Sequence, residues 1–291
     1  MAGLSFGQKE ITLVIDPGHG GKDPGNEARF SGHEDEKDLN LKIATYLGGY
    51  IEKYLQHVKV VYTRTDDSYP TLDQRVDKAN GINADYFISI HCNGNDNPNV
   101  RGTESIIHDM RSTVALDFAK KIERQFSRRA GRKSRGVKNK EDLHHSIQVL
   151  KYTKMPSVLV ECGFMTNRTE ANYLNSTYGQ EILASAIFRA FRSFIQGQHP
   201  GTDYVRKSPN TNAPPTGKDF AIQIMSSKNP VDTDSPQFKK LGEPVRRVKL
   251  NTSSPYKYIY TVGNYASRKL AKNALPKIQS SGFSDAFVVR R

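Results

Sequence analysis

Short apolar runs recur along the first two thirds of the chain, and each is bounded by glycine, proline or charged residues. The apolar part of each run is four to six residues long and rich in valine and isoleucine, which is typical of buried β-strands. The predicted strands are residues 11–16 (ITLVID), 58–64 (VKVVYTR), 86–91 (YFISIH), 103–108 (TESIIH) and 157–161 (SVLVE).

Segments with a helical period lie between these runs. Apolar residues recur at every fourth position in residues 36–55 and again from Val114 to Phe126, and residues 180–195 form a further apolar helix. Thr71 and Gln74 have the spacing of a capping box at a helix start. Strands alternating with helices predict an α/β fold in which a mainly parallel sheet is flanked by helices.

The pattern changes near residue 198. Residues 198–217 are rich in proline, threonine, asparagine and glycine, which predicts an extended linker. After it, residues 218–291 follow the order strand, helix, strand, strand, helix, strand, so that we predict a small βαββαβ ferredoxin-like α+β domain. The predicted organisation is therefore a domain at 1–197, a linker at 198–217 and a second domain at 218–291.

Charge separates the two predicted domains. The chain has a formal net charge of +13, of which residues 1–197 contribute only +3 and residues 218–291 contribute +9. A basic domain implies an anionic partner such as nucleic acid, a membrane surface or an acidic cell-wall polymer. No apolar run approaches the roughly 20 residues that span a bilayer, so we expect no membrane insertion.

Three predicted strands end in residues able to do chemistry. His19 follows the first strand in the sequence VIDPGHGG, His91 ends the strand ISIH, and Glu161 ends the strand VLVE. In open α/β sheets, ligands bind outside the carboxyl ends of the strands. Glu36 begins the first long helix on its sheet-facing side, with Glu34 and Asp35 as alternatives for the same role.

Two histidines and one carboxylate are a common ligand set of catalytic zinc, and a second carboxylate can act as general base. His19, Glu36 and His91 fit the first requirement, and Glu161 fits the second. Glycines 18, 20 and 21 would allow the sharp bend that carries His19. Taken singly, each histidine is equally explained as a hydrogen-bonded loop residue and Glu36 as a helix N-terminal acid, so spacing alone leaves both interpretations open.

A family resemblance favours the metal site. The segments VIDPGHGGKDPG, EKDLNLKIA, TRTDD, RVDKAN, FISIHCN, RGTES and TKMPSVLVECGFMTN resemble, in order and spacing, the zinc-dependent N-acetylmuramoyl-L-alanine amidases of the Amidase_3 family, over about residues 10–196. The resemblance implies a Zn²⁺ cofactor held by His19, Glu36 and His91, with Glu161 as the catalytic residue. It implies hydrolysis of the peptidoglycan amide between the lactyl group of N-acetylmuramic acid and L-alanine, in cell-wall remodelling and daughter-cell separation.

The chain departs from some members of that family. Only the residues DMRS separate the strand TESIIH from the next helix, where some relatives insert a helix that plugs the site. We therefore expect an open site that needs no activator protein. His144 and His145 lie in a segment that is slightly longer than expected from the family. They could contact substrate, but solvated loop residues are the simpler interpretation. Cys92 and Cys162 are expected to be buried thiols on the sheet face opposite His91 and Glu161.

The second domain resembles a SPOR domain in the segments FAIQIMSS, YIYTVGNYASRKLA and GFSDAFVVRR. The resemblance implies binding to glycan strands without stem peptides, and we assign Gln223, Tyr260 and Tyr265 to the binding surface of its sheet. The two tyrosines are equally explained as ordinary strand residues. A basic βαββαβ sheet with aromatics also suits RNA, but the Lys/Arg-Gly pattern of an RNA-recognition motif is missing, so no nucleic acid is expected.

The expected location is the periplasm or cell envelope, because a peptidoglycan amidase acts there. The first ten residues lack the apolar region of a signal peptide, and the sequence alone leaves open whether such a signal was removed or never existed. An envelope location implies that an export signal was cut away. We expect a monomer. The alternative activities are a zinc hydrolase of another amide, either a peptidase or a sugar deacetylase, and a metal-free glycan-binding protein, which the intact set of four residues disfavours.

Overall fold

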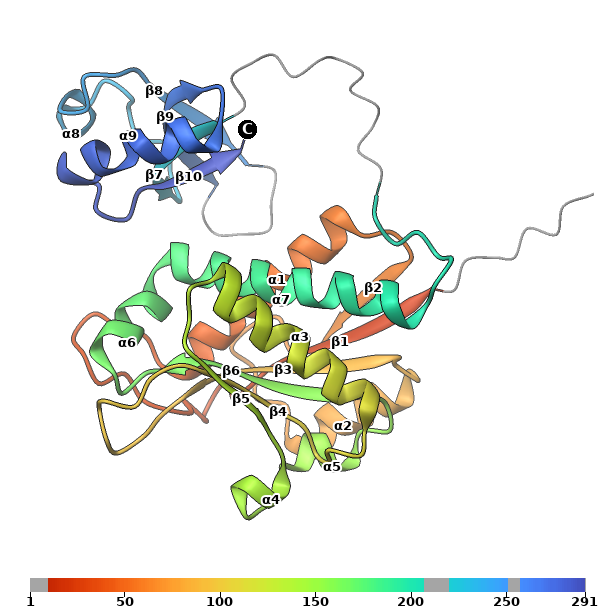
Figure 1. Cartoon of the computed structure of the whole chain (residues 1–291). Coiled ribbons are helices and arrows are strands. Elements are labelled where there is room, and N and C mark those ends of the chain that lie inside the picture. Colours follow the sequence, from red (N-terminus) through yellow and green to blue (C-terminus); the bar gives the residue numbers. More distant parts are fainter. Residues whose placement is uncertain (1–9, 207–219, 251–256, 291) are drawn as a thin grey trace, which may run out of the picture. The chain divides into compact units, whose positions relative to one another are not determined.

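The computed structural model describes residues 10–206, 220–250 and 257–290. The chain divides into two compact units, Met1–Lys207 and Ser208–Arg291. Each unit buries a hydrophobic core of its own. The two units are thus separate domains, each with its own sheet and helices (Figure 1).

The first unit is built on a six-stranded sheet with the strand order β2-β1-β3-β6-β4-β5. Its strands are β1 (Ile11–Pro17), β2 (Val58–Tyr62), β3 (Tyr86–Asn93), β4 (Thr103–Ile106), β5 (Ser134–Lys138) and β6 (Ser157–Phe164). All neighbours are parallel except β4 and β6, which are antiparallel. The predicted α/β architecture is confirmed, with a mixed sheet that includes one strand, β5, that the sequence pattern did not predict.

Helices cover both faces of this sheet (Figure 1). Those of the first unit are α1 (Glu36–Tyr54), α2 (Leu72–Gly81), α3 (Thr113–Arg129), α4 (Lys140–Leu143), α5 (Gln148–Tyr152), α6 (Arg168–Asn175) and α7 (Thr177–Gln198). Helices α1, α3 and α7 bury their apolar sides in the larger core cluster, while α2 and α5 pack in a smaller cluster on the opposite face. Among the helices in the described part of the chain, none combines the length and the apolar character that spanning a membrane requires.

Local sequence signals explain where two of these helices begin. Thr71 caps α2, since its side chain accepts from the backbone N–H of Gln74 and the Gln74 side chain accepts from the Thr71 N–H. This is the predicted capping box, and it satisfies two donors at the helix start. Ser176 caps α7, where its hydroxyl accepts from the Gly179 N–H.

The first unit extends beyond the boundary predicted at residue 197. Tyr204 is fully buried, and its carbonyl accepts from the Gln56 N–H at 2.9 Å. The Arg206 N–H donates to the Tyr54 carbonyl at 2.9 Å. The beginning of the predicted linker is thus a packed part of this unit, and residues 207–217 lie outside the described residues.

The second unit contains a four-stranded antiparallel sheet with the order β10-β7-β9-β8. Its elements are β7 (Phe220–Ser227), α8 (Pro236–Lys239), β8 (Val245–Lys249), β9 (Tyr258–Tyr265), α9 (Arg268–Ser280) and β10 (Phe287–Arg290). Along the chain they follow the predicted order of strands and helices. Their assignment to the ferredoxin-like class stays a prediction.

The prediction that Tyr260 faces solvent on this sheet is wrong. Tyr260 is fully buried and stacks on Phe238 of α8, with 5.4 Å between ring centroids. Gln223 is only 6% exposed, and Tyr265 is half-buried against the same core. Tyr260 alternates along β9 with Tyr258 and Val262, which contact the same core, so the strand period is regular and only the choice of face is wrong.

Candidate metal centre

The loop after β1 bends sharply and turns His19 towards α1. His19 has a φ of 61°, and it is followed by Gly20 and Gly21 with φ of 131° and 54°. Such left-handed conformations favour glycine, so the two glycines make the bend possible. The His19 Nδ1 atom lies 2.8 Å from Asp23 Oδ2, which fixes the ring and leaves Nε2 directed at Glu36.

Gly18 serves a different purpose from the other glycines of the loop. A Cβ atom at Gly18 would lie 2.2 Å from both Cε1 and Nε2 of His91. Gly25 is similarly constrained, because its Cβ would lie 2.6 Å from His19 Cδ2 and 2.7 Å from Glu36 Oε2. Both glycines are therefore required for the close approach of the loop to the histidine and carboxylate side chains.

Glu36 is the first residue of α1 and is 3% exposed. Its Oε2 accepts from the backbone N–H and the side-chain amide of Asn26, at 2.9 and 2.7 Å. Its Oε1 accepts from the Cys92 N–H at 3.1 Å and from the Asn40 amide at 3.2 Å. These donors hold an ionised carboxylate in one orientation.

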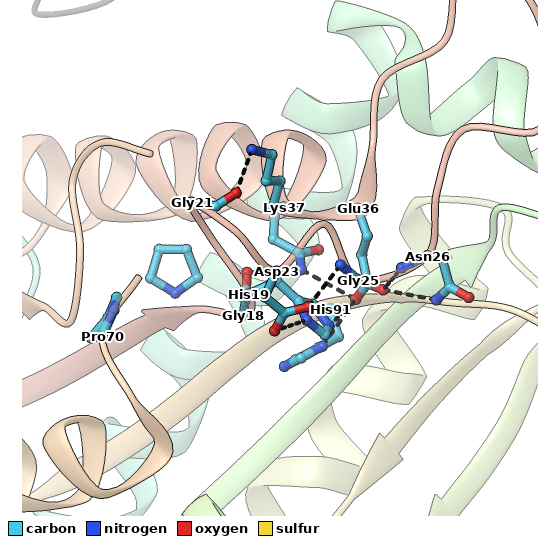
Figure 2. A network of polar contacts seen from close by, with 12 residues as sticks. Gly18, His19, Gly21, Asp23, Gly25, Asn26, Glu36, Lys37, Pro70 and His91 are labelled. Carbon is cyan, nitrogen blue, oxygen red and sulfur yellow. Dashed lines mark hydrogen bonds and ion pairs between the residues drawn. The ribbon is translucent and has the colours of Figure 1, made fainter. Parts of the chain in front are cut away.

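His19, Glu36 and His91 converge on one point (Figure 2). Glu36 Oε1 lies 3.3 Å from His19 Nε2 and 3.0 Å from His91 Nδ1. The centroids of the two imidazole rings are 4.9 Å apart. One ligand atom from each residue lies within 4.8 Å of the others. Two imidazole nitrogens and one carboxylate oxygen are the donor set that suits zinc, so the residues fit this ion.

The electrostatics of the cluster keep Glu36 ionised. Burial raises the pKa of Glu36, but hydrogen bonds to His19 and His91 outweigh it and hold the pKa well below the usual range. Burial lowers the pKa of His19, and hydrogen bonds to Glu36 and Asp23 outweigh this too, so that its pKa is raised. The site thus favours positive charge beside Glu36, as a cation-binding site requires.

Glu161 lies beside His91 in the sheet. The two residues are register partners in the β3–β6 pair, and Glu104 is the register partner of Glu161 on its other side. Within the described part of the chain, the Oε2 atom of Glu161 is buried and has no hydrogen-bond partner. Burial first, and then the negative charges of Glu36 and Glu104, raise the pKa of Glu161 well above its usual range.

Glu104 is itself held by two cations from β5. Lys138 Nζ donates to Glu104 Oε2 at 2.8 Å, and Arg135 donates to the other carboxylate oxygen. Across the sheet, the register partners are therefore His91, Glu161 and Glu104, and the Glu104 carboxylate is ion-paired with the two cations of β5. Glu161 supplies one free carboxylate oxygen beside His91 of the candidate metal-ligand cluster.

The alternatives for the role of Glu36 have other partners. Glu34 pairs with Lys42, and Asp35 Oδ1 accepts from the Ala28 N–H at 2.9 Å. His144 and His145 are exposed next to α4, where His145 Nδ1 lies 2.9 Å from the Leu143 carbonyl oxygen. Neither histidine belongs to the ligand cluster.

The two cysteines are free and buried, as predicted. Cys92 and Cys162 belong to the larger core cluster, whereas Phe87 and Leu159, which share strand faces with His91 and Glu161, belong to the opposite one. The thiols therefore lie on the other face of the sheet from the site. Burial raises the pKa of both thiols well above the usual range, which makes them poor nucleophiles.

Sequence reasoning missed the residues that support the three candidate ligands. Asp23 orients His19, while Asn26 and Asn40 donate to Glu36. Asn40 is four residues after Glu36 on α1, a spacing that places the two side chains together and that offered a signal. Asn26 and Asp23 lie in a loop without periodicity, so only the folded structure identifies their partners.

Known proteins resemble this chain over the first unit. The family model described as "N-acetylmuramoyl-L-alanine amidase", Amidase_3, matches residues 13–193. N-acetylmuramoyl-L-alanine amidase LytC of Bacillus subtilis is 34% identical over 177 residues, which is 60% of this chain and 34% of LytC. The probable cell wall amidase LytH of Staphylococcus aureus is 33% identical over 185 residues, which is 63% of this chain and 58% of LytH.

A solved structure of an amidase is also similar to this chain. The crystal structure of an N-acetylmuramoyl-L-alanine amidase from Clostridium difficile 630 has a TM-score of 0.61 and 32% identity, and the match covers 66% of this chain and 100% of that one. The family model matches more than half of the chain, and the matched residues include His19, Glu36, His91 and Glu161. The chain belongs to the Amidase_3 family of N-acetylmuramoyl-L-alanine amidases.

Proposed function

We propose that the protein is a zinc-dependent hydrolase of peptidoglycan that cleaves the amide between the lactyl group of N-acetylmuramic acid and L-alanine of the stem peptide. The observation that carries the proposal is the convergence of His19, Glu36 and His91 beside Glu161 in a chain of this amidase family. In the proposal, the three convergent residues hold the ion.

When bound, zinc supplies a Lewis acid that polarises the scissile carbonyl and favours ionisation of water. Glu161 acts as general base and takes the proton of the attacking water. It then delivers that proton to the nitrogen of L-alanine as the C–N bond breaks, so that the products are a lactyl carboxylate and a free amine. The raised pKa of Glu161 makes its carboxylate a stronger proton acceptor than that of an ordinary glutamate.

No covalent bond to the enzyme is needed in this scheme. The free carboxylate oxygen of Glu161 lies on the same sheet face as His91, and both buried thiols lie on the other face. Asp23 and Asn26 keep the His19 ring and the Glu36 carboxylate in fixed orientations, so the ligands need little rearrangement to bind the ion.

The second unit, in this proposal, binds peptidoglycan glycan strands and brings the hydrolase to its substrate. Its basic composition and its resemblance to SPOR domains support this role.

We further propose that the protein acts as a monomer in the cell envelope during wall remodelling and daughter-cell separation. The short connection between β4 and α3 supports a site that needs no activator.

The variant Glu161→Gln tests whether Glu161 acts as the general base and not as a metal ligand. It preserves the size of the side chain and removes its ability to accept a proton. We expect zinc content equal to that of the wild type, with turnover reduced by about 10²- to 10⁴-fold. Turnover equal to wild type at equal zinc content would remove Glu161 from the mechanism.

A further inference from the structure

Arg64, just beyond the end of β2, is 3% exposed, and its hydrogen bonds within the described residues all go to main-chain carbonyls. Its Nε donates to the Pro17 carbonyl at 2.9 Å, and its Nη2 donates to the carbonyls of Gly18 and Lys37, both at 2.8 Å. Its Nη1 donates to the Asp66 carbonyl at 2.8 Å. The planar guanidinium thus connects four carbonyl groups from three segments.

Two of these segments carry metal ligands. Pro17 and Gly18 directly precede His19 in the loop after β1, and Lys37 directly follows Glu36 at the start of α1. A single nitrogen, Arg64 Nη2, donates to the main chain of both segments. Asn40 of α1 also reaches the Gly18 carbonyl, but this bond is long at 3.4 Å. Arg64 is therefore a direct connection between the backbones that place His19 and Glu36.

Arg75 of α2 completes the support of the same bend. Its Nη1 donates to the Pro17 carbonyl at 2.8 Å and to Asp16 Oδ1 at 2.6 Å, and its Nη2 donates to the His19 carbonyl at 2.7 Å. The carbonyls of all three residues from Pro17 to His19 thus accept hydrogen bonds from buried arginines. Arg75 neutralises the buried Asp16, whereas Arg64, among the residues described, bonds carbonyls rather than carboxylates.

A buried cation without a hydrogen-bonded carboxylate is costly, and it is retained where its geometry is needed. A lysine cannot replace it, because an ammonium group is a point donor that cannot reach four carbonyls in different directions. A second connection between the loop and α1 lies at the surface. Lys37 Nζ donates to the Gly21 carbonyl at 2.9 Å (Figure 2) and to Asp67 Oδ2 at 2.8 Å.

We propose that Arg64 is a positioning residue that fixes the separation of His19 from Glu36 and so preorganises the metal site. The inference rests on the proposed function for the identity of the ion, zinc, but not for the role of Arg64 in holding the two backbones together. It also gives a reason for the arginine in the segment TRTDD, whose hydrogen bonds go to the main chain beside the ligands rather than to the ligand side chains.

The test uses Arg64→Met, which removes all donors, and Arg64→Lys, which keeps the charge. Zinc affinity is measured by competition with a chromogenic chelator. Loss of a group that supports the ligands typically weakens metal binding about 10- to 100-fold. We expect a loss of that size for Arg64→Met and no full rescue by Arg64→Lys. Arg132→Met is the control, because Arg132 bonds Glu170 and stacks on Tyr173, away from the elements that carry ligands.

A second measurement is independent of zinc. Amide hydrogen exchange of the metal-free protein reports on the Gly20 N–H, bonded to the Asp23 carbonyl at 2.9 Å, and on the Lys37 N–H, bonded to the Pro24 carbonyl at 3.1 Å. Both should exchange faster in Arg64→Met, while amides inside β1 keep wild-type protection. Wild-type zinc affinity together with wild-type exchange at both amides would overturn the positioning role. A wild-type protein that binds no zinc would instead overturn the proposed function, and the exchange data would still decide the role of Arg64.

Discussion

Gly18 lies against the imidazole ring of His91, so closely that a Cβ atom at this position would lie 2.2 Å from two ring atoms. The obstacle is a ring held by Glu36 rather than the end of a flexible side chain. Space at Gly18 is therefore a condition for placing His91 in the cluster.

Gly18→Ala should weaken zinc binding and reduce hydrolysis in proportion to metal occupancy, because His91 must move to admit the methyl group. We expect at least a roughly tenfold loss of zinc affinity, in the range for disturbed ligand positions. Gly49→Ala is the matched control. Nothing lies within 4 Å of its added Cβ, and alanine in the middle of α1 should raise the free energy of unfolding by about 1 kcal/mol without affecting zinc.

The acid side of the pH–rate profile should respond to Glu104. As the proposed general base, Glu161 would accept a proton only when ionised, so the rate should fall as the pH decreases through the pKa of Glu161. Burial, Glu36 and Glu104 raise that pKa. Glu104→Gln removes one negative charge and leaves Lys138 without its carboxylate partner, and both changes lower the pKa of Glu161.

We therefore expect the acid limb of kcat/KM to move to lower pH in Glu104→Gln. Glu123→Gln serves as the control, since Glu123 is also buried and bonds Thr103 and Ser105 of β4, yet its charge is not among those acting on Glu161. An acid limb that stays in place in Glu104→Gln, or moves equally in both variants, would contradict this coupling.

Glu181 on α7 should make the protein less stable as the pH rises. Burial raises the pKa of Glu181 from its ordinary value of 4.5 to about 7, so the folded state binds its proton more tightly than the unfolded state. Stability is then lost as the pH rises from about 4.5 to about 7, by on the order of 3 kcal/mol. Glu181→Gln should remove this loss and be stabilising at pH 8 but not at pH 4, as measured by urea denaturation. Glu52→Gln, exposed on α1, is the control.

Removal of residues 208–291 should separate catalysis from binding to the wall. The first unit retains its core, including the buried Tyr204, so hydrolysis of soluble muropeptides should stay within about twofold of the full chain. Binding to intact sacculi in a pelleting assay should weaken because the basic second unit is gone. Equal retention of both proteins on sacculi would leave that unit without the proposed role.

Much of the site was predictable because its chemistry lies at strand ends. The apolar runs that form β1, β3 and β6 end at or just before His19, His91 and Glu161, which places all three residues at one edge of a sheet. Helical periodicity places Glu36 on the side of α1 that faces them. These signals depend on local sequence, where side-chain period and backbone conformation are directly linked.

The parts that could not be predicted depend on contacts between distant segments. β5 has the sequence SRGVK, which lacks an apolar run, and it is recognisable only from its pairing with β4. The antiparallel insertion of β4 next to β6 is likewise a matter of tertiary pairing. Arg64 and Tyr260 show the same limit. Backbone carbonyls brought together by folding define the role of Arg64, and the packing of Phe238 of α8 on Tyr260 shows which face of β9 is buried.

Zinc-dependent cleavage of the lactyl–L-alanine amide can be examined by mass spectrometry of the products that the purified protein releases from peptidoglycan. The reaction is run with the protein as isolated, after treatment with a chelator, and after zinc is restored. We predict free stem peptides that begin with L-alanine, lost with the chelator and recovered with zinc. Intact peptidoglycan in the presence of fully zinc-loaded protein, or release of fragments cut at another bond, would contradict the proposed activity.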